Sequence, residues 1–239
     1  MPDPLTVQET CNLAPYPCQE DGTNLSTFMT FIYLASQSPR RSQLLDQLGV
    51  RHELLIPAPE EDAEALEATI SGELPLRYVE RVTRAKLWAA QMRLKKRGLP
   101  PAPILCSDTT VALGRRILGK PADAADAAAT LALLSGKTHR VLTCVALAWG
   151  HPGRVTEALA TSTSRVRFAT LSADQIDSYV ASGEPFGKAG AYAIQSAAAA
   201  WIAYIEGSYS GIMGLPLFET AQLLTQAQLN HSAVTPKKN

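Results

Sequence analysis

The sequence predicts an α/β domain built around a mixed β-sheet. Runs of apolar and β-branched residues that resemble strands alternate with segments of helical periodicity, and no internal repeat is present. Hairpin-like returns between some of the runs indicate antiparallel as well as parallel strand pairs. With 46% hydrophobic and 18% charged residues, the chain has enough apolar material for a core, which excludes wholesale disorder.

Two helices and three strand-like runs are predicted in the first half of the chain. Ser38 is a candidate N-cap, Pro39 suits the first helical position, and Gly49 ends this helix. A second helix is predicted from Pro75 to about Lys96. Its expected inner face consists of Leu76, Val79, Thr83, Lys86 and Ala90. The strand-like runs are 31–35, 104–106 and 110–113.

The second half continues the mixed order of elements. An alanine-rich helix is predicted from Asp123 to Leu134, and Ser172 is expected to cap another helix that continues to Val180. A last helix spans 216–224. Strands are expected at 141–149, 161–168, 191–194 and 201–205.

Charge and cysteine content exclude several function classes. The 22 basic and 22 acidic residues balance, so there is no basic excess to neutralise the phosphates of a nucleic acid, whereas a small anionic ligand needs only a local basic cluster. Cys11 and Cys18 are not spaced as in a CxxC motif and have no histidine near them in the sequence, so a zinc site is not expected, and four cysteines in a chain of this length do not suit a disulfide scaffold. No segment is typical of a signal peptide or a membrane span, so we expect a cytoplasmic protein with no membrane partner.

The composition also predicts the domain organisation. Residues 1–28 are proline-rich and lack an apolar period, so we expect a disordered N-terminal tail. Met29 comes just before the first strand-like run and is a candidate start of translation. A single domain is expected over 29–229, followed by a flexible C-terminus over 230–239.

The run from Ser36 to Arg41 is a candidate anion site. A strand is expected to lead here into a helix N-terminus that carries two serines and the arginines Arg40 and Arg41. Free backbone N–H groups and the helix dipole favour an anion at such a place, and arginine binds phosphate oxygens in a bidentate manner. The alternative is an ordinary helix cap with two solvated arginines. Cations in a first helical turn oppose the dipole, which favours the anion site.

Further charged residues are weaker candidates taken singly. Lys86 is on the apolar face of its helix, where it either binds a ligand or extends its ammonium to water. Asp108 lies between two strand-like runs, a common place for a base or a metal ligand but also for a turn. Lys120 follows a glycine in a loop, and Glu61 belongs to an acidic run that either binds a divalent cation or is simply solvated. His139 is expected to be structural.

Taken together, several segments in a fixed order resemble the Maf family of nucleotide pyrophosphatases, over about residues 31 to 225. The segments lead from Leu34–Arg41 through Ser107–Val111 and Leu118–Pro121 to a glycine-rich block at 183–195 and its continuation at 207–220. The segment Lys188–Tyr192 with Gln195 is similar to that of the dTTP/UTP pyrophosphatase branch. Where the family usually has glycines after this glutamine, the chain has Ser196–Ala200.

This resemblance implies a fold, a reaction and a set of site residues. The fold would be elongated and two-lobed around a deep cleft, similar to inosine triphosphate pyrophosphatases, and the protein would be a homodimer. The enzyme would use a divalent metal cation (Mg or Mn) to hydrolyse dTTP and UTP to the monophosphate and pyrophosphate, clearing non-standard or excess nucleotides. Asp108 matches the family's base. Its phosphate and metal region is matched by Ser36, Arg40, Arg41, Glu61, Lys86 and Lys120, with Glu61 and Asp108 for the metal. Positions tied to base choice are matched by Arg40, Thr109 and Gln195.

Two other functions stay open from the sequence. One is a pyrophosphatase that acts on 7-methyl-GTP or another modified nucleotide, although that branch of the family has a different segment at the position of Lys188–Gln195. The other is a nucleotide-binding regulator of cell division with little turnover, which the presence of Asp108 together with the lysines argues against. Release of pyrophosphate from a panel of nucleotides would separate the three.

Overall fold

The computed structural model describes residues 31–62, 64–151 and 153–229. Within these residues a seven-stranded mixed sheet is combined with six α-helices and three short 3₁₀ helices. The predicted tail at 1–28, Met29 and the C-terminus at 230–239 lie outside the described residues. The α/β class and the mixed sheet are therefore confirmed.

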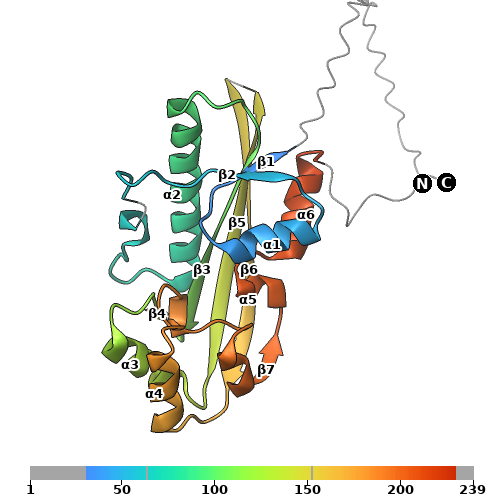
Figure 1. The fold of residues 1–239 in the computed structure, drawn as a ribbon. Helices are drawn as coiled ribbons and strands as arrows, with labels where there is room; N and C mark the ends of the chain where they lie inside the picture. The colour runs from blue at the N-terminus through green and yellow to red at the C-terminus, as the bar shows by residue number, and fades with distance from the viewer. Residues whose placement is uncertain (1–30, 63, 152, 230–239) are drawn as a thin grey trace, which may run out of the picture.

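The sheet runs in the order β2-β1-β3-β5-β6-β7, and β4 pairs with β3 beside this path. β1 pairs in parallel with β2 and β3, whereas the other pairs are antiparallel. The long strands β5 and β6 run the length of the elongated molecule (Figure 1). The strands are β1 (Ile32–Leu34), β2 (His52–Leu54), β3 (Ile104–Leu113), β4 (Arg116–Leu118), β5 (Thr138–His151), β6 (Arg154–Phe168) and β7 (Ile202–Glu206).

The helices cover both faces and one end of the sheet (Figure 1). α2 packs on one face, α1, α5 and α6 lie on the other, and α3 and α4 lie together at one end. The α-helices are α1 (Pro39–Gln47), α2 (Pro75–Lys96), α3 (Ala124–Leu134), α4 (Ala173–Ala181), α5 (Tyr209–Met213) and α6 (Leu217–Gln226). The 3₁₀ helices are η1 (Ala65–Glu67), η2 (Ala189–Ala191) and η3 (Ala197–Trp201).

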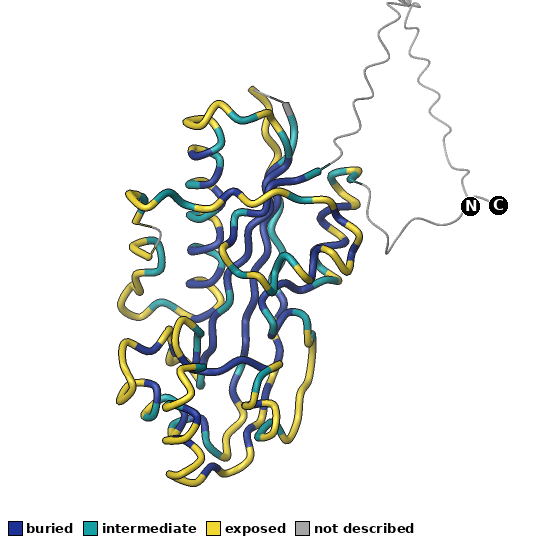
Figure 2. The backbone as a smooth tube through the Cα atoms, in the orientation of Figure 1, coloured by how far each residue is buried: buried dark blue, intermediate teal, exposed yellow. Residues whose placement is uncertain are grey.

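Alternation along β3 divides the core between the two faces of the sheet. Ile104 and Cys106 pack under Leu87 of α2, whereas Leu105 packs with Leu44 of α1 on the other face. This follows from the two-residue period of a strand, which sends successive side chains to opposite faces. Figure 2 shows the result as buried residues along the sheet and exposed residues at the loops.

Helix boundaries agree closely with the local sequence signals. α1 begins at Pro39 and is followed by Gly49 with φ +66°, and α2 begins at Pro75. The side chain of Asp123 accepts a hydrogen bond from the backbone of Asp126 at the start of α3. α4 has a full capping box formed by Ser172 and Gln175.

Several details differ from the sequence-based expectations. β3 is one continuous strand through Asp108, rather than two runs around it. The segment 191–194 is not a strand, because Gly190 and Ala191 have φ angles of +70° and +60° and the chain turns there. Leu76, which was expected on the inner face of α2, is 42% exposed. The short elements β2, β4 and α5 were not predicted, since three to five residues carry too little periodicity.

His139 is a buried structural residue, as predicted. Its side chain is 1% exposed, its Nε2 atom shares a 2.8 Å hydrogen bond with the hydroxyl of Tyr192, and its ring packs edge-on against Phe168. Burial lowers the pKa of His139 from 6.5 to about 4, since the charged imidazolium is poorly solvated there. The residue therefore ties β5 to the segment after η2 in its neutral form.

We predict that this histidine makes the fold sensitive to moderate acid. Between pH 6.5 and 4 the unfolded chain binds a proton at His139 that the folded chain does not, so stability is complete above pH 6.5 and falls as the pH falls. The loss amounts to about 3 kcal/mol at most. Urea unfolding at pH 7 and pH 4.5 should show a flatter pH dependence for His139→Gln than for the wild type. Equal slopes would contradict this account.

Candidate active site

The pocket lies at a break in the pairing along one edge of β3. On this edge β1 pairs with Ile104 and Leu105, and β4 pairs with 111–113, so residues 106–110 have no strand partner there among the described residues. β1 ends beside this break and leads into the N-terminus of α1. In α/β sheets ligands bind in such crevices beyond the carboxyl ends of parallel strands. The pocket at this place has a volume of about 480 Å³.

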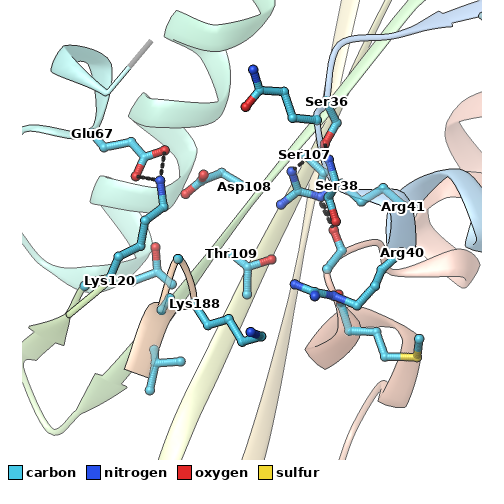
Figure 3. Close-up of a pocket in the computed structure, with 18 of the residues that line it drawn as sticks. Ser36, Ser38, Arg40, Arg41, Glu67, Ser107, Asp108, Thr109, Lys120 and Lys188 are labelled. Atoms are coloured by element: carbon cyan, nitrogen blue, oxygen red, sulfur yellow. Dashed lines mark hydrogen bonds and ion pairs between the residues drawn. The ribbon is translucent and has the colours of Figure 1, made fainter. Parts of the chain in front are cut away.

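The break lets β3 present both of its faces to one pocket. Asp108 points to the α2 side, where Lys86 donates to its Oδ1 at 2.5 Å. Thr109 points to the opposite side, where its hydroxyl shares a hydrogen bond with Thr143. Both residues line the pocket (Figure 3). Gln195 lines it as well. A ligand at this edge can therefore contact side chains from both faces of the sheet.

Lys86 joins two carboxylates from separate elements. Its ammonium donates to Oε1 of Glu67 at 2.7 Å as well as to Asp108. Burial opposes the charge of Lys86, but the two carboxylates more than offset this and raise its pKa. Lys120 contacts the other side of Glu67, at 2.9 Å from its Oε2 (Figure 3). Burial acts to raise the pKa of Glu67, yet Lys86 and Lys120 bring it below the usual value.

The N-terminus of α1 carries a second group of cations. Ser36 is buried, and its hydroxyl accepts from Nη1 of Arg41 at 3.0 Å and from the backbone of Ser38 at 3.1 Å. Nε of Arg41 donates to the carbonyl of Gly214 at 2.8 Å. Burial lowers the pKa of Arg41, against the opposing effect of Asp108. Arg40 has a long contact of 3.4 Å to the carbonyl of Met213.

The arrangement brings most of the predicted residues together. Lining the pocket are Ser36, Arg40, Arg41, Lys86, Asp108, Thr109, Lys120 and Gln195. Ser38 precedes α1 as predicted, but its side chain makes no capping hydrogen bond. The alanines after Gln195 form η3 with a hydrogen bond from the Ser196 hydroxyl to the carbonyl of Ala193, so this turn needs no glycine.

Glu61 lies apart from this group. Nε and Nη2 of Arg93 bind its carboxylate at 2.7–3.0 Å, and Glu61 does not line the pocket. This pairing, with burial opposing it, lowers the pKa of Glu61 to about 2. A metal-binding role for Glu61 stays a prediction, and the structure offers Glu67 as the carboxylate nearest to the Asp108–Lys86 pair.

Sequence reasoning missed Glu67 and left Lys188 without a role. Glu67 is one of several acidic residues between 60 and 73, and no periodicity separates it from the others. Lys188 lines the pocket from the glycine-rich segment before η2 (Figure 3). The segment 183–195 is rich in glycine and contains charged residues, which is typical of a loop that lines a site, but a loop has no period that would orient a side chain.

We predict that Glu61 contributes to stability through Arg93. Only 5% of the Arg93 side chain is exposed, so Glu61→Gln leaves a buried guanidinium without its charged acceptor. Urea unfolding should show a loss of about 1–3 kcal/mol. Glu60→Gln is the matched control, because Glu60 is exposed and the structure gives it no ion pair. Equal stability of Glu61→Gln and the control would contradict the assignment.

Comparison with known proteins places the chain in a family. A relative from a Polaromonas species, named dTTP/UTP pyrophosphatase, is 66% identical over 199 residues, covering 83% of this chain and 96% of that protein. Proteins of the same name from Albidiferax ferrireducens and Burkholderia pseudomallei are 66% and 61% identical, covering 81% and 83% of this chain and 95% and 94% of their own lengths. The family profile described as Maf-like protein matches residues 31–227, and the chain therefore belongs to the Maf-like protein family.

Proposed function

We propose that this protein is a nucleoside triphosphate pyrophosphatase that hydrolyses dTTP and UTP to the monophosphate and pyrophosphate. The observation that carries the proposal is the position of Asp108, a buried carboxylate on the floor of a pocket with cations on either side. The names of the relatives support the same reaction, and favour dTTP and UTP over 7-methyl-GTP.

In this proposal the cations bind the triphosphate. Hydrolysis at the α-phosphorus needs positive groups around the phosphate oxygens, because negative charge is redistributed over them in the transition state. Arg41 comes from α1, Lys86 from α2 and Lys120 from the loop after β4, and all three line the pocket. Ser36 holds the Arg41 guanidinium in place through its hydroxyl. A triphosphate bound among these groups would have its charge neutralised along its length.

Asp108 is the proposed general base. It would accept a proton from the water whose oxygen attacks the α-phosphorus, while the bond to the bridging oxygen breaks and pyrophosphate leaves. Lys86 supports this role, since its ammonium donates a hydrogen bond to Oδ1 of Asp108 and so orients the carboxylate. Only 7% of Asp108 is exposed, so a water molecule or substrate can reach its carboxylate only through the pocket.

A divalent cation, Mg or Mn, is part of the proposal. Carboxylate oxygens suit these ions, and Mg²⁺ is commonly held by one or two carboxylates together with substrate phosphates. Asp108 and Glu67 fit this requirement, because both carboxylates contact the same Lys86 ammonium. Glu61, the residue proposed from the resemblance, would have to leave Arg93 to take part. When bound, such a cation would neutralise charge on the phosphates.

Base choice is proposed to depend on Gln195, Thr109 and Arg40. Thymine and uracil present an acceptor, a donor and an acceptor along O2, N3–H and O4, and a glutamine amide can pair with two of these. Gln195 lines the pocket, is exposed, and makes no hydrogen bond within the described part of the chain, so its amide is free to meet a base. Cytosine would leave part of this pairing unmatched.

Three coarser features complete the proposal. The elongated shape suits a two-lobed fold with the pocket as its cleft, as in inosine triphosphate pyrophosphatases. A homodimer is proposed from the family resemblance, and a cytoplasmic location from the lack of a segment typical of a signal peptide. No helix in the described part of the chain is long and apolar enough to cross a bilayer.

We predict that Asp108→Asn abolishes most of the hydrolysis of dTTP while nucleotide binding persists. The substitution keeps the size of the side chain but removes the charge that accepts a proton, which costs about 10²–10⁴-fold in rate. Single-turnover release of pyrophosphate measures the rate, and equilibrium binding of dTTP measures the affinity. A variant that hydrolyses dTTP at nearly the wild-type rate would refute the role of Asp108.

We predict that Gln195→Glu lowers the turnover of dTTP relative to CTP. A carboxylate cannot donate to O4 of thymine, and an unpaired buried polar group costs about 1–3 kcal/mol. The measurement is the ratio of kcat/KM for the two nucleotides. Were Gln195 to support only the backbone of the turn at 196–200, all nucleotides would lose activity equally and the ratio would stay unchanged.

A further inference from the structure

The charges in the pocket are divided unevenly between its two sides. On the side of α2, Lys86 and Lys120 contact the carboxylates of Asp108 and Glu67, and Lys120 also lies 3.7 Å from a carboxylate oxygen of Glu64. On the opposite side lie Arg40, Arg41 and Lys188, and within the described residues none of these three forms an ion pair with a carboxylate. Each of these two cations on the α2 side therefore contacts a carboxylate, whereas the three cations on the opposite side give it a local excess of positive charge.

Lys188 contributes to this excess from a loop. Its ammonium donates to the backbone carbonyl of Glu184. Figure 3 shows its side chain extending into the pocket below Thr109, toward the side where Arg40 lies. Burial, and then the positive charge of Arg40, lower the pKa of Lys188, whereas the Glu184 carboxylate acts to raise it. Holding two cations near each other in a partly buried site is unfavourable in the absence of an anion.

The backbone around Lys188 is fixed by close packing. The N–H of Gly190 donates to the carbonyl of Gly119 at 3.0 Å, which ties this segment to the loop of Lys120. A Cβ atom on Gly190 would lie 2.8 Å from Cγ1 of Val111 on β3, so only glycine allows the approach. Lys188 thus emerges from a backbone held against the sheet, and its ammonium has a defined place in the pocket.

An ordinary role in loop stability is the alternative for Lys188. A lysine that only satisfied the carbonyl of Glu184 would gain nothing from lining the pocket beside Arg40. The carbonyl is a neutral acceptor, and within the described residues Lys188 forms no ion pair, so that the Glu184 carboxylate acts on its charge only from a greater distance. A phosphate oxygen would supply that partner and relieve the repulsion from Arg40 at the same time.

We propose that Lys188 is a phosphate-binding residue, which together with Arg40 clamps the polyphosphate of the substrate from the side opposite to Lys86 and Lys120. The inference rests on the proposed function and adds to it a substrate-binding residue from the glycine-rich loop. Arg40 would then affect base choice indirectly, because fixing the phosphates fixes how far the base reaches toward Gln195.

The test uses inorganic tripolyphosphate and thymidine as separate probes of the two parts of a nucleotide. Isothermal titration of the full chain should show that Lys188→Met weakens tripolyphosphate binding about tenfold or more, since a charge-assisted hydrogen bond is lost. Thymidine binding should stay unchanged. Lys188→Arg, which keeps the charge, should recover most of the affinity. Lys96→Met, an exposed lysine at the end of α2 outside the pocket, is the matched control.

Other results would overturn the proposal. These are wild-type affinity for tripolyphosphate in Lys188→Met, an equal loss of thymidine binding, no rescue by arginine, or no tripolyphosphate binding by the wild type. If a thermal melt shows that Lys188→Met is not folded, Lys188→Gln takes its place, and its affinity for tripolyphosphate is compared with that of the wild type. The titrations involve no turnover. If the wild type binds tripolyphosphate through Lys188 but does not hydrolyse dTTP, the phosphate-binding role of Lys188 is supported and the proposed reaction is refuted.

Discussion

The contact of the Lys86 ammonium with Asp108 and Glu67 is the interaction on which the site depends. It joins three separate elements, α2, β3 and η1, through a side chain that emerges from the apolar face of a helix. A carboxylate as buried as Asp108 is costly to keep charged without a partner. Lys86 supplies that partner for Asp108. Glu67 accepts a second hydrogen bond from the same ammonium, so the positive charge of Lys86 is shared between two carboxylates.

The break along the edge of β3 makes this contact accessible to a ligand. Between the residues that pair with β1 and those that pair with β4, this edge of β3 has no neighbouring strand among the described residues. Side chains from both faces of β3 therefore line one pocket. The α2 face offers Asp108, and the opposite face offers Thr109 with its partner Thr143. The sheet thus places the carboxylate of Asp108 on one side and the hydroxyl groups of Thr109 and Thr143 on the other, and a single ligand can contact both.

Local signals in the sequence were sufficient for the long elements and for the helix ends. Prolines at first helical positions, such as Pro39 and Pro75, predicted the beginnings of α1 and α2 because proline is preorganised for that position. The continuity of β3 through Asp108 was not predictable in this way, because a charged residue inside a run resembles a turn. What keeps the strand intact is its pairing with β5, where Asp108 lies opposite Cys144. That pairing is a long-range contact, which local patterns do not encode.

The site was predictable to a different degree for each residue. Ser36 and the two arginines after it follow from a strand leading into a helix N-terminus, and the structure gathers them as expected. Glu61 and Glu67 could not be told apart, because their difference lies in tertiary partners: Arg93 for one and Lys86 for the other. The family resemblance predicted the roles of these residues in the reaction. The contact of Lys86 with the carboxylates of Asp108 and Glu67 is visible only in three dimensions.

The most direct test of the central claim is the fate of solvent oxygen during hydrolysis of dTTP in H₂¹⁸O. If Asp108 activates a water for attack at the α-phosphorus, mass spectrometry of the products will find the heavy oxygen in the nucleoside monophosphate and none in pyrophosphate. Heavy oxygen in the pyrophosphate, or release of inorganic phosphate with a nucleoside diphosphate, would mean that the pocket holds the substrate in another register and would contradict the account.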